Sequence, residues 1–148
     1  HDTTSNTEAI MDKFLTPVAR LFMGHIFLLA GFSKIGQYVG TQGYMEAMGV
    51  PGALLPLVIA VEIVGGLAII IGFQAKWTAL ALAGFSIVSA VIFHANFADQ
   101  TQMILFMKNW AMAGGLLLLT VHGAGHFSVD NYLARSRSKS PEPAGATA

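Results

Sequence analysis

The chain has 148 residues, of which 54% are hydrophobic and 11% charged, whereas soluble domains carry about 25% charged residues. The formal net charge is zero and the mean hydropathy is +0.61, which excludes a conventional cytosolic enzyme, a nucleic-acid binder and a disordered protein. The chain has no cysteine, so disulfides, thiolate zinc sites and iron–sulfur clusters are also excluded. This composition is typical of a small integral membrane protein.

Four apolar segments are long enough to cross a bilayer as helices, which takes about 20 residues each. They cover residues 18–35, 53–73, 77–97 and 103–121. We therefore predict an all-α fold, a polytopic membrane four-helix bundle that occupies residues 17–133. Thr16 and Pro17 are typical of the start of a helix, and the glycines and proline of residues 49–52 separate the first two spans.

The segments outside the spans are polar. Residues 1–16 are interpreted as a polar, interfacial N-terminal segment with a frayed beginning, and residues 134–148 as a disordered basic tail. The connection 36–52 has two interpretations. It forms either a short helix at the membrane interface, with Tyr38 and Tyr44 at head-group level, or a loop that caps the bundle.

The distribution of lysine and arginine predicts the orientation, because cytoplasmic flanks carry an excess of both. With four spans, the two termini lie on the same side as the turn at residues 74–76. That side holds six cationic residues: Lys13, Arg20, Lys76, Arg135, Arg137 and Lys139. The other side holds Lys34 and Lys108. Both termini are therefore expected in the cytoplasm of a bacterium, in its inner membrane, with Arg20 and Lys34 extending from the ends of the first span.

Glu62 and Lys108 lie within the spans, where a charge costs about 2.5–3.5 kcal/mol on insertion scales. Glu62 shares a helix face with Gly65 and Gly66, and glycines allow a neighbouring helix to approach closely. Its carboxyl group is then either protonated or paired with a cation. Lys108 can extend towards Glu62 or towards the outer interface. Either residue contributes to a ligand-linked or proton-linked site, or only holds helices together.

Three spans bring cation-capable side chains to the outer third of the bilayer. These are Lys34 at the end of the first span, His94 in the third, and Lys108, next to Asn109, in the fourth. With Glu62 below them, they predict a polar pocket that opens outward and suits an anionic or carbonyl-bearing ligand. The candidate ligand-linked or proton-linked residues are Lys34, Glu62, His94, Lys108 and Asn109.

His25 is a secondary candidate, because it lies at the depth of Glu62 and a hydrogen bond between them is conceivable. A histidine that is simply satisfied within the bundle is the more common case. By helix rise, His25, His94 and His122 lie at different depths, so we predict no metal or haem site. No nucleophile–base pair or phosphate-binding loop occurs in the sequence either.

Over residues 14–133, the chain resembles the DoxX family of small bacterial membrane proteins in several short motifs and in their order. The motifs are Arg20-Leu21-Phe22, Gly31-Phe32-Ser33-Lys34, Gly49-Val50-Pro51, Glu62 with Gly65-Gly66 and Gly72, His94, Lys108-Asn109-Trp110-Ala111 with Gly114-Gly115, and Gly123-Ala124-Gly125 with Ser128 and Asp130.

This resemblance implies a four-helix inner-membrane protein. Some DoxX proteins are small subunits of thiosulfate:quinone oxidoreductases, others associate with redox or detoxifying proteins, and many have no assigned activity. It therefore implies a subunit that supports a quinone-linked or redox partner. We expect no cofactor bound by this chain alone, so the redox centre would belong to that partner or to a quinone. Lys34, His94 or Lys108 would polarise a quinone carbonyl, with Glu62 as a proton source.

Two other functions stay open. The protein could be a purely structural or assembly subunit, whose charges only connect helices. It could instead be a carrier of a small solute, which four spans would achieve only as a homo-oligomer. A weak repeat favours the carrier, since Leu29-Ala30-Gly31-Phe32-Ser33 recurs at residues 82–86.

Overall fold

The computed structural model describes residues 2–140, which contain helices and no strand. The helices are α1 (Asp2–Gly36), α2 (Tyr38–Ala47), the 3₁₀ turn η1 (Gly52–Leu54), α3 (Leu55–Ile71), α4 (Ala75–Phe93), α5 (Gln100–His122) and α6 (Val129–Ser138). Four helical stretches are long and apolar enough to cross a membrane: α1, η1 together with α3, α4 and α5. The predicted all-α fold with four spans is confirmed.

Both ends of the described chain contain more helix than the sequence predicts. Residues 2–16 continue α1, and Pro17 lies inside the helix instead of starting it. A proline removes one backbone donor, and this loss does not end the helix here. Residues 134–138 belong to α6, whose N-cap Ser128 accepts a hydrogen bond from the amide of Asn131. The tail beyond residue 140 lies outside the described residues.

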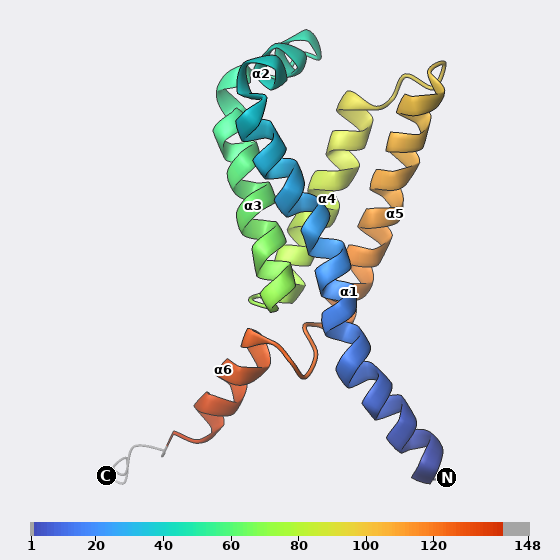
Figure 1. Ribbon diagram of the computed structural model, residues 1–148, viewed down its shortest axis with the longest axis vertical. Coiled ribbons are helices and arrows are strands. Elements are labelled where there is room, and N and C mark those ends of the chain that lie inside the picture. The colour runs from blue at the N-terminus through green and yellow to red at the C-terminus, as the bar shows by residue number, and fades with distance from the viewer. Residues whose placement is uncertain (1, 141–148) are drawn as a thin grey trace, which may run out of the picture.

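The spans form two helix pairs, α1 with α3 and α4 with α5 (Figure 1). The pairs approach each other near the turn between α3 and α4 and diverge towards the end where α2 lies. The connection 36–52 contains a short helix, α2, so the helix of its first interpretation is confirmed. The N-terminal end of α1 and α6 lie at the same end of the molecule, opposite α2.

The helices α1 and α3 approach each other at two glycines. A Cβ atom on Gly66 would lie 2.8 Å from both the carbonyl oxygen of Gly24 and the amide nitrogen of Leu28. A Cβ atom on Gly24 would in turn lie 2.6 Å from the carbonyl oxygen of Gly66. The two backbones are therefore in direct contact, as small residues permit in membranes.

Arg20 does not extend into solvent from the end of its span as predicted, because only 2% of it is exposed. Its Nη1 atom donates to the carbonyl oxygen of Ile70 at 3.0 Å and to that of Ile69 at 3.5 Å. Its Nη2 atom donates to the carbonyl oxygen of Phe127. The last carbonyl groups of a helix lack intrahelical donors. Arg20 supplies N–H donors to such carbonyl groups at the end of α3.

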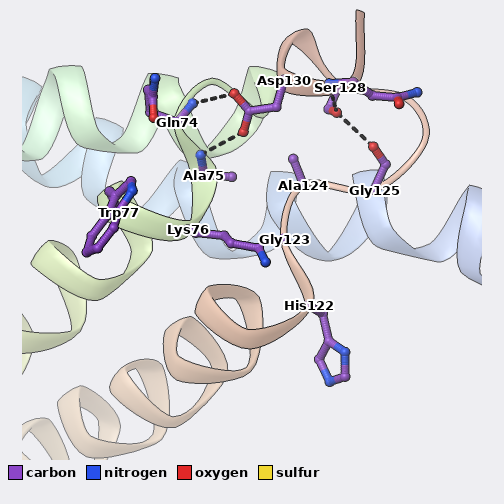
Figure 2. Close-up of a pocket in the computed structure, with 11 residues that line it drawn as sticks. Gln74, Ala75, Lys76, Trp77, His122, Gly123, Ala124, Gly125, Ser128 and Asp130 are labelled. Carbon is purple, nitrogen blue, oxygen red and sulfur yellow. Dashed lines mark hydrogen bonds between the residues drawn. The ribbon is translucent and has the colours of Figure 1, made fainter. Parts of the chain in front are cut away.

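Asp130 fixes the C-terminal segment to the turn between α3 and α4 (Figure 2). Its carboxylate accepts hydrogen bonds from the amides of Gln74 at 2.7 Å and Ala75 at 2.9 Å, so it caps the start of α4. Its own amide donates to the carbonyl oxygen of Gly72 at 2.9 Å. Gly72 ends α3 with φ +73°, a conformation that favours glycine.

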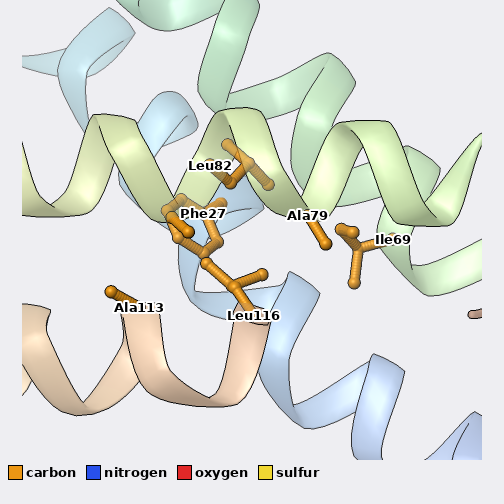
Figure 3. Packing of buried hydrophobic residues seen from close by; sticks show 7 residues of the cluster. Phe27, Ile69, Ala79, Leu82, Ala113 and Leu116 are labelled. Carbon is orange, nitrogen blue, oxygen red and sulfur yellow. The ribbon is translucent and has the colours of Figure 1, made fainter. Parts of the chain in front are cut away.

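All four spans contribute side chains to one apolar core (Figure 3). Its buried members are Phe27 of α1, Ile69 of α3, Ala79, Leu82 and Ala83 of α4, and Ala113 and Leu116 of α5. The alanines keep the helices close, and the larger side chains fill the space between the two pairs. This core holds the pairs together where they converge and leaves the other end of the bundle open to a cavity.

We predict that Gly66→Ala destabilises the protein by about 1–3 kcal/mol, because its methyl group would overlap the backbone of α1. Gly84→Ala is the matched control, since a Cβ atom there meets nothing within 4 Å. It should leave stability unchanged or raise it by less than about 1 kcal/mol. The free energy of unfolding in mixed micelles measures both, and equal effects would contradict the close contact of α1 and α3.

Candidate functional site

A cavity of about 430 Å³ lies between the two helix pairs and next to α2. We call it the interhelical cavity. Its polar lining consists of Lys34, Thr41, Tyr44, Glu62, Ser86, Ser89, His94, Lys108 and Asn109. Its apolar lining includes Phe27, Phe85, Phe93, Met45, Met112 and several aliphatic side chains. The five candidate residues of the sequence analysis therefore all line one cavity. Its size lies within the range of about 300–1,000 Å³ of small-molecule sites.

Lys34 and Glu62 form an ion pair at the side of the cavity that belongs to α1 and α3. The Nζ atom of Lys34 lies 2.9 Å from both carboxylate oxygens of Glu62. The side chain of Glu62 is 6% exposed and that of Lys34 is 29% exposed. The lysine therefore shields the carboxylate and itself remains reachable from the cavity.

The sequence suggested Lys108 or His25 as the partner of Glu62, and the structure assigns this position to Lys34. The depth of a residue follows from helix rise, but its direction around the helix axis depends on packing. Gly31, one turn before Lys34, lies so close to α3 that a Cβ atom on it would be 2.5 Å from Ile63 Cγ1 and 3.3 Å from Glu62 Cβ. This contact brings Lys34 into reach of Glu62, while Lys108 belongs to the other helix pair.

Lys108 and Asn109 of α5 line the opposite side of the cavity. Neither side chain makes a hydrogen bond or ion pair with any other residue in the range 2–140. Lys108 is exposed and Asn109 half-buried. An ammonium group and a carboxamide thus offer donors to the cavity that no protein group uses.

His94 and Tyr44 lie at the end of the cavity next to α2. His94 ends α4, and its Nδ1 atom lies 2.7 Å from Oε1 of Gln102. The tautomer with the proton on Nδ1 donates to this carbonyl oxygen, and Nε2 is the second polar atom of the ring. The hydroxyl of Tyr44 donates to the carbonyl oxygen of Phe93 at 2.9 Å, so α2 is connected to α4 across the cavity. Sequence reasoning placed Tyr44 at head-group level and missed this contact.

His25 does not line the cavity and does not bind Glu62. It is exposed, and its Nδ1 atom lies 2.6 Å from the carbonyl oxygen of Phe22 in its own helix. Its direction on α1 explains this difference, because Gly24 and Phe27 occupy the buried face. Within residues 2–140, no group of three His, Asp or Glu side chains is placed to hold a metal ion.

The relatives of the chain agree with this membrane fold. The DoxX family model matches residues 15–95. Inner membrane protein YqjF of Escherichia coli K12 is 53% identical over 116 residues, which cover 78% of this chain and 89% of that protein. The chain belongs to the DoxX family. A second relative, inner membrane protein YphA of the same organism, is 35% identical over 121 residues, covering 76% of this chain and 86% of YphA. No solved structure matches the chain significantly.

The Lys34–Glu62 ion pair should contribute to the free energy of unfolding. We expect Lys34→Met to lower the free energy of unfolding by about 2 kcal/mol, because a buried carboxylate then loses its cation. The double variant Lys34→Met/Glu62→Gln should be more stable than Lys34→Met, because it removes both charges together. Unfolding in mixed micelles measures this double-mutant cycle, with Lys108→Met as the control for losing an unpaired lysine. Additive effects of the two substitutions would contradict the pairing.

Proposed function

We propose that this protein is a membrane subunit that binds the head group of a quinone in the interhelical cavity and supports a redox partner. The observation that carries this proposal is a lysine–carboxylate pair in a mostly apolar cavity, opposite two donors without protein partners. A quinone head group is a flat apolar ring with two carbonyl oxygens. The ring would pack against the aromatic and aliphatic side chains of the cavity, and the two carbonyl oxygens would accept hydrogen bonds from donors on its two sides.

The donor set of the cavity fits such a ligand. Lys108 and Asn109 are free to donate to one carbonyl oxygen, and Lys34 reaches the cavity from the other helix pair. A bound quinone supplies the two-electron redox chemistry that the side chains of this chain lack. In this arrangement Lys34 and Lys108 bind and orient the ring, and Glu62 holds or releases a proton beside it.

A purely structural role explains the ion pair less well. The backbones of α1 and α3 are already in contact at Gly24 and Gly66, so the pair is not needed to bring these helices together. Buried ion pairs are, moreover, weak stabilisers compared with apolar side chains of similar size. A structural role also gives no reason for Lys108 and Asn109 to face the same cavity without partners.

The names of YqjF and YphA place those proteins in the inner membrane. We infer the same multi-pass location for this chain, with both termini in the cytoplasm as the lysine and arginine distribution predicts. In that orientation the interhelical cavity lies in the periplasmic half of the bilayer. A membrane or membrane-associated redox protein, or a second copy of this chain, would complete the functional unit.

The test is a titration of the purified protein in detergent with 2,3-dimethoxy-5-methyl-1,4-benzoquinone. In a Trp77→Phe background, Trp110, next to Asn109, reports binding by fluorescence quenching. We expect saturable quenching, with affinity at least about tenfold weaker in Lys108→Met, because a charged hydrogen bond contributes about 1.5–3 kcal/mol. Asn109→Ala should weaken binding less.

Lys76→Met is the control, because Lys76 is an exposed lysine near the opposite end of the bundle and does not line this cavity. It should bind the quinone like the parent protein. Quenching that does not saturate, or that Lys76→Met reduces as much as Lys108→Met, would refute the site. Variants of Lys34 and Glu62 that change stability but not affinity would favour the structural role.

A further inference from the structure

Three cation-capable side chains gather around Phe127 at the end of the molecule opposite the interhelical cavity. They come from three segments: Lys13 from α1, His126 from the loop after α5, and Arg135 from α6. The Nζ atom of Lys13 lies 5.1 Å from the ring centroid of Phe127, and the His126 ring lies 4.9 Å from the same ring. Nη2 of Arg135 lies 3.2 Å from Nδ1 of His126. We call these three side chains the Phe127 basic cluster.

The cluster forms no ion pair among residues 2–140. No carboxylate lies within ion-pair distance of Lys13 or Arg135. Asp130 is occupied by the amides of Gln74 and Ala75, and Asp12 accepts a hydrogen bond from Thr16. Partial burial lowers the pKa of His126, and the charges of Lys13 and Arg135 lower it further. His126 therefore lies beside two positive charges that no ion pair within residues 2–140 neutralises.

The donors of the cluster suit a phosphate group. Arg135 donates to Nδ1 of His126, so Nε2 of the neutral imidazole carries the proton and is a donor. An ammonium, a guanidinium and an imidazole N–H group therefore lie close together, and no carboxylate in the described part of the chain is paired with them. Arginine and lysine form short, strong hydrogen bonds with phosphate oxygens.

The position of the cluster matches the level of lipid head groups. From Lys13 to Lys34, α1 rises by roughly 31 Å, which is about the thickness of the hydrocarbon core. Trp77, Tyr132 and Phe127 are exposed at this end, as aromatic side chains are at membrane interfaces. The rise of α1 and the exposed aromatic side chains both indicate that the cluster lies at the level of the phosphates of one leaflet.

The surface of α1 next to the cluster is apolar and uncovered. Ile10, Met11, Phe14 and Leu15 are between 52% and 57% exposed. Their spacing puts them on one side of the helix, and Phe14 contacts Phe127 at a ring-centroid distance of 5.7 Å. A phosphate bound at the cluster would thus have apolar surface beside it for an acyl chain. A soluble anion would leave this surface exposed.

We propose that Lys13, His126 and Arg135 bind the phosphate of an anionic phospholipid, whose acyl chain covers the apolar side of α1 around Phe14. The lipid connects the N-terminal part of α1 to α6 through one shared anion. This site is separate from the interhelical cavity and does not depend on the quinone proposal.

The experiment uses the full chain in an uncharged detergent, titrated with short-chain phosphatidylglycerol while thermal unfolding is followed. Binding to the folded state raises the unfolding temperature with lipid concentration. We expect saturable stabilisation, and apparent affinity at least about tenfold weaker in the Lys13→Gln/Arg135→Gln variant. Arg137→Gln/Lys139→Gln removes the same charge from the same end of the molecule, and should weaken binding less than about threefold.

Two ligand controls distinguish the source of the phosphate. Phosphatidylcholine of the same chain length should stabilise the protein much less, and inorganic phosphate at equal concentration should not stabilise it. Equal weakening in the two double variants, or equal stabilisation by inorganic phosphate, would overturn the proposal. If Lys13→Gln/Arg135→Gln does not fold, Lys13→Gln alone keeps the contact of Arg135 with His126 and should weaken binding about threefold to fivefold.

Discussion

The backbone contact between Gly24 and Gly66 is the constraint on which the rest of the molecule depends. Because α1 and α3 run in opposite directions, residues before Gly24 face residues after Gly66. Residues after Gly24 likewise face residues before Gly66. One turn before Gly24, Arg20 reaches the carbonyl groups of Ile69 and Ile70. Further along α1, Lys34 reaches Glu62. A larger residue at either glycine would separate the helices and move both cations away from their partners.

The two cations of α1 illustrate two ways of placing a charge near the membrane. The guanidinium of Arg20 is buried among carbonyl oxygens at the end of α3, where its donors satisfy backbone groups that lipid cannot. Lys34 instead pairs with a side chain and remains partly accessible from a cavity. The first arrangement stabilises the fold at a fixed geometry. The second keeps an ionisable pair available to a ligand, and the second helix pair adds Lys108 and Asn109 without partners.

The sequence predicts the four spans well, because apolar length alone determines whether a helix can cross a bilayer. It also places Lys34, Glu62, His94 and Lys108 at compatible depths, since helix rise is constant. It does not predict direction around each helix axis, which depends on the contacts between helices. For that reason the partner of Glu62 and the exposure of His25 were not predictable. Arg20 resembles a flanking residue because nothing in its own span indicates that α3 ends beside it.

The capping of α4 by Asp130 has a consequence for how the protein is made. The carboxylate that accepts from the amide of Ala75 belongs to a residue 55 positions later in the chain. A nascent chain emerges from its N-terminus, so α3 and α4 are synthesised well before their turn can acquire this cap. Until then, interfacial water must satisfy the amides of Gln74 and Ala75. A residue synthesised 55 positions later therefore completes the turn between α3 and α4, and a chain released before Asp130 would keep that turn open.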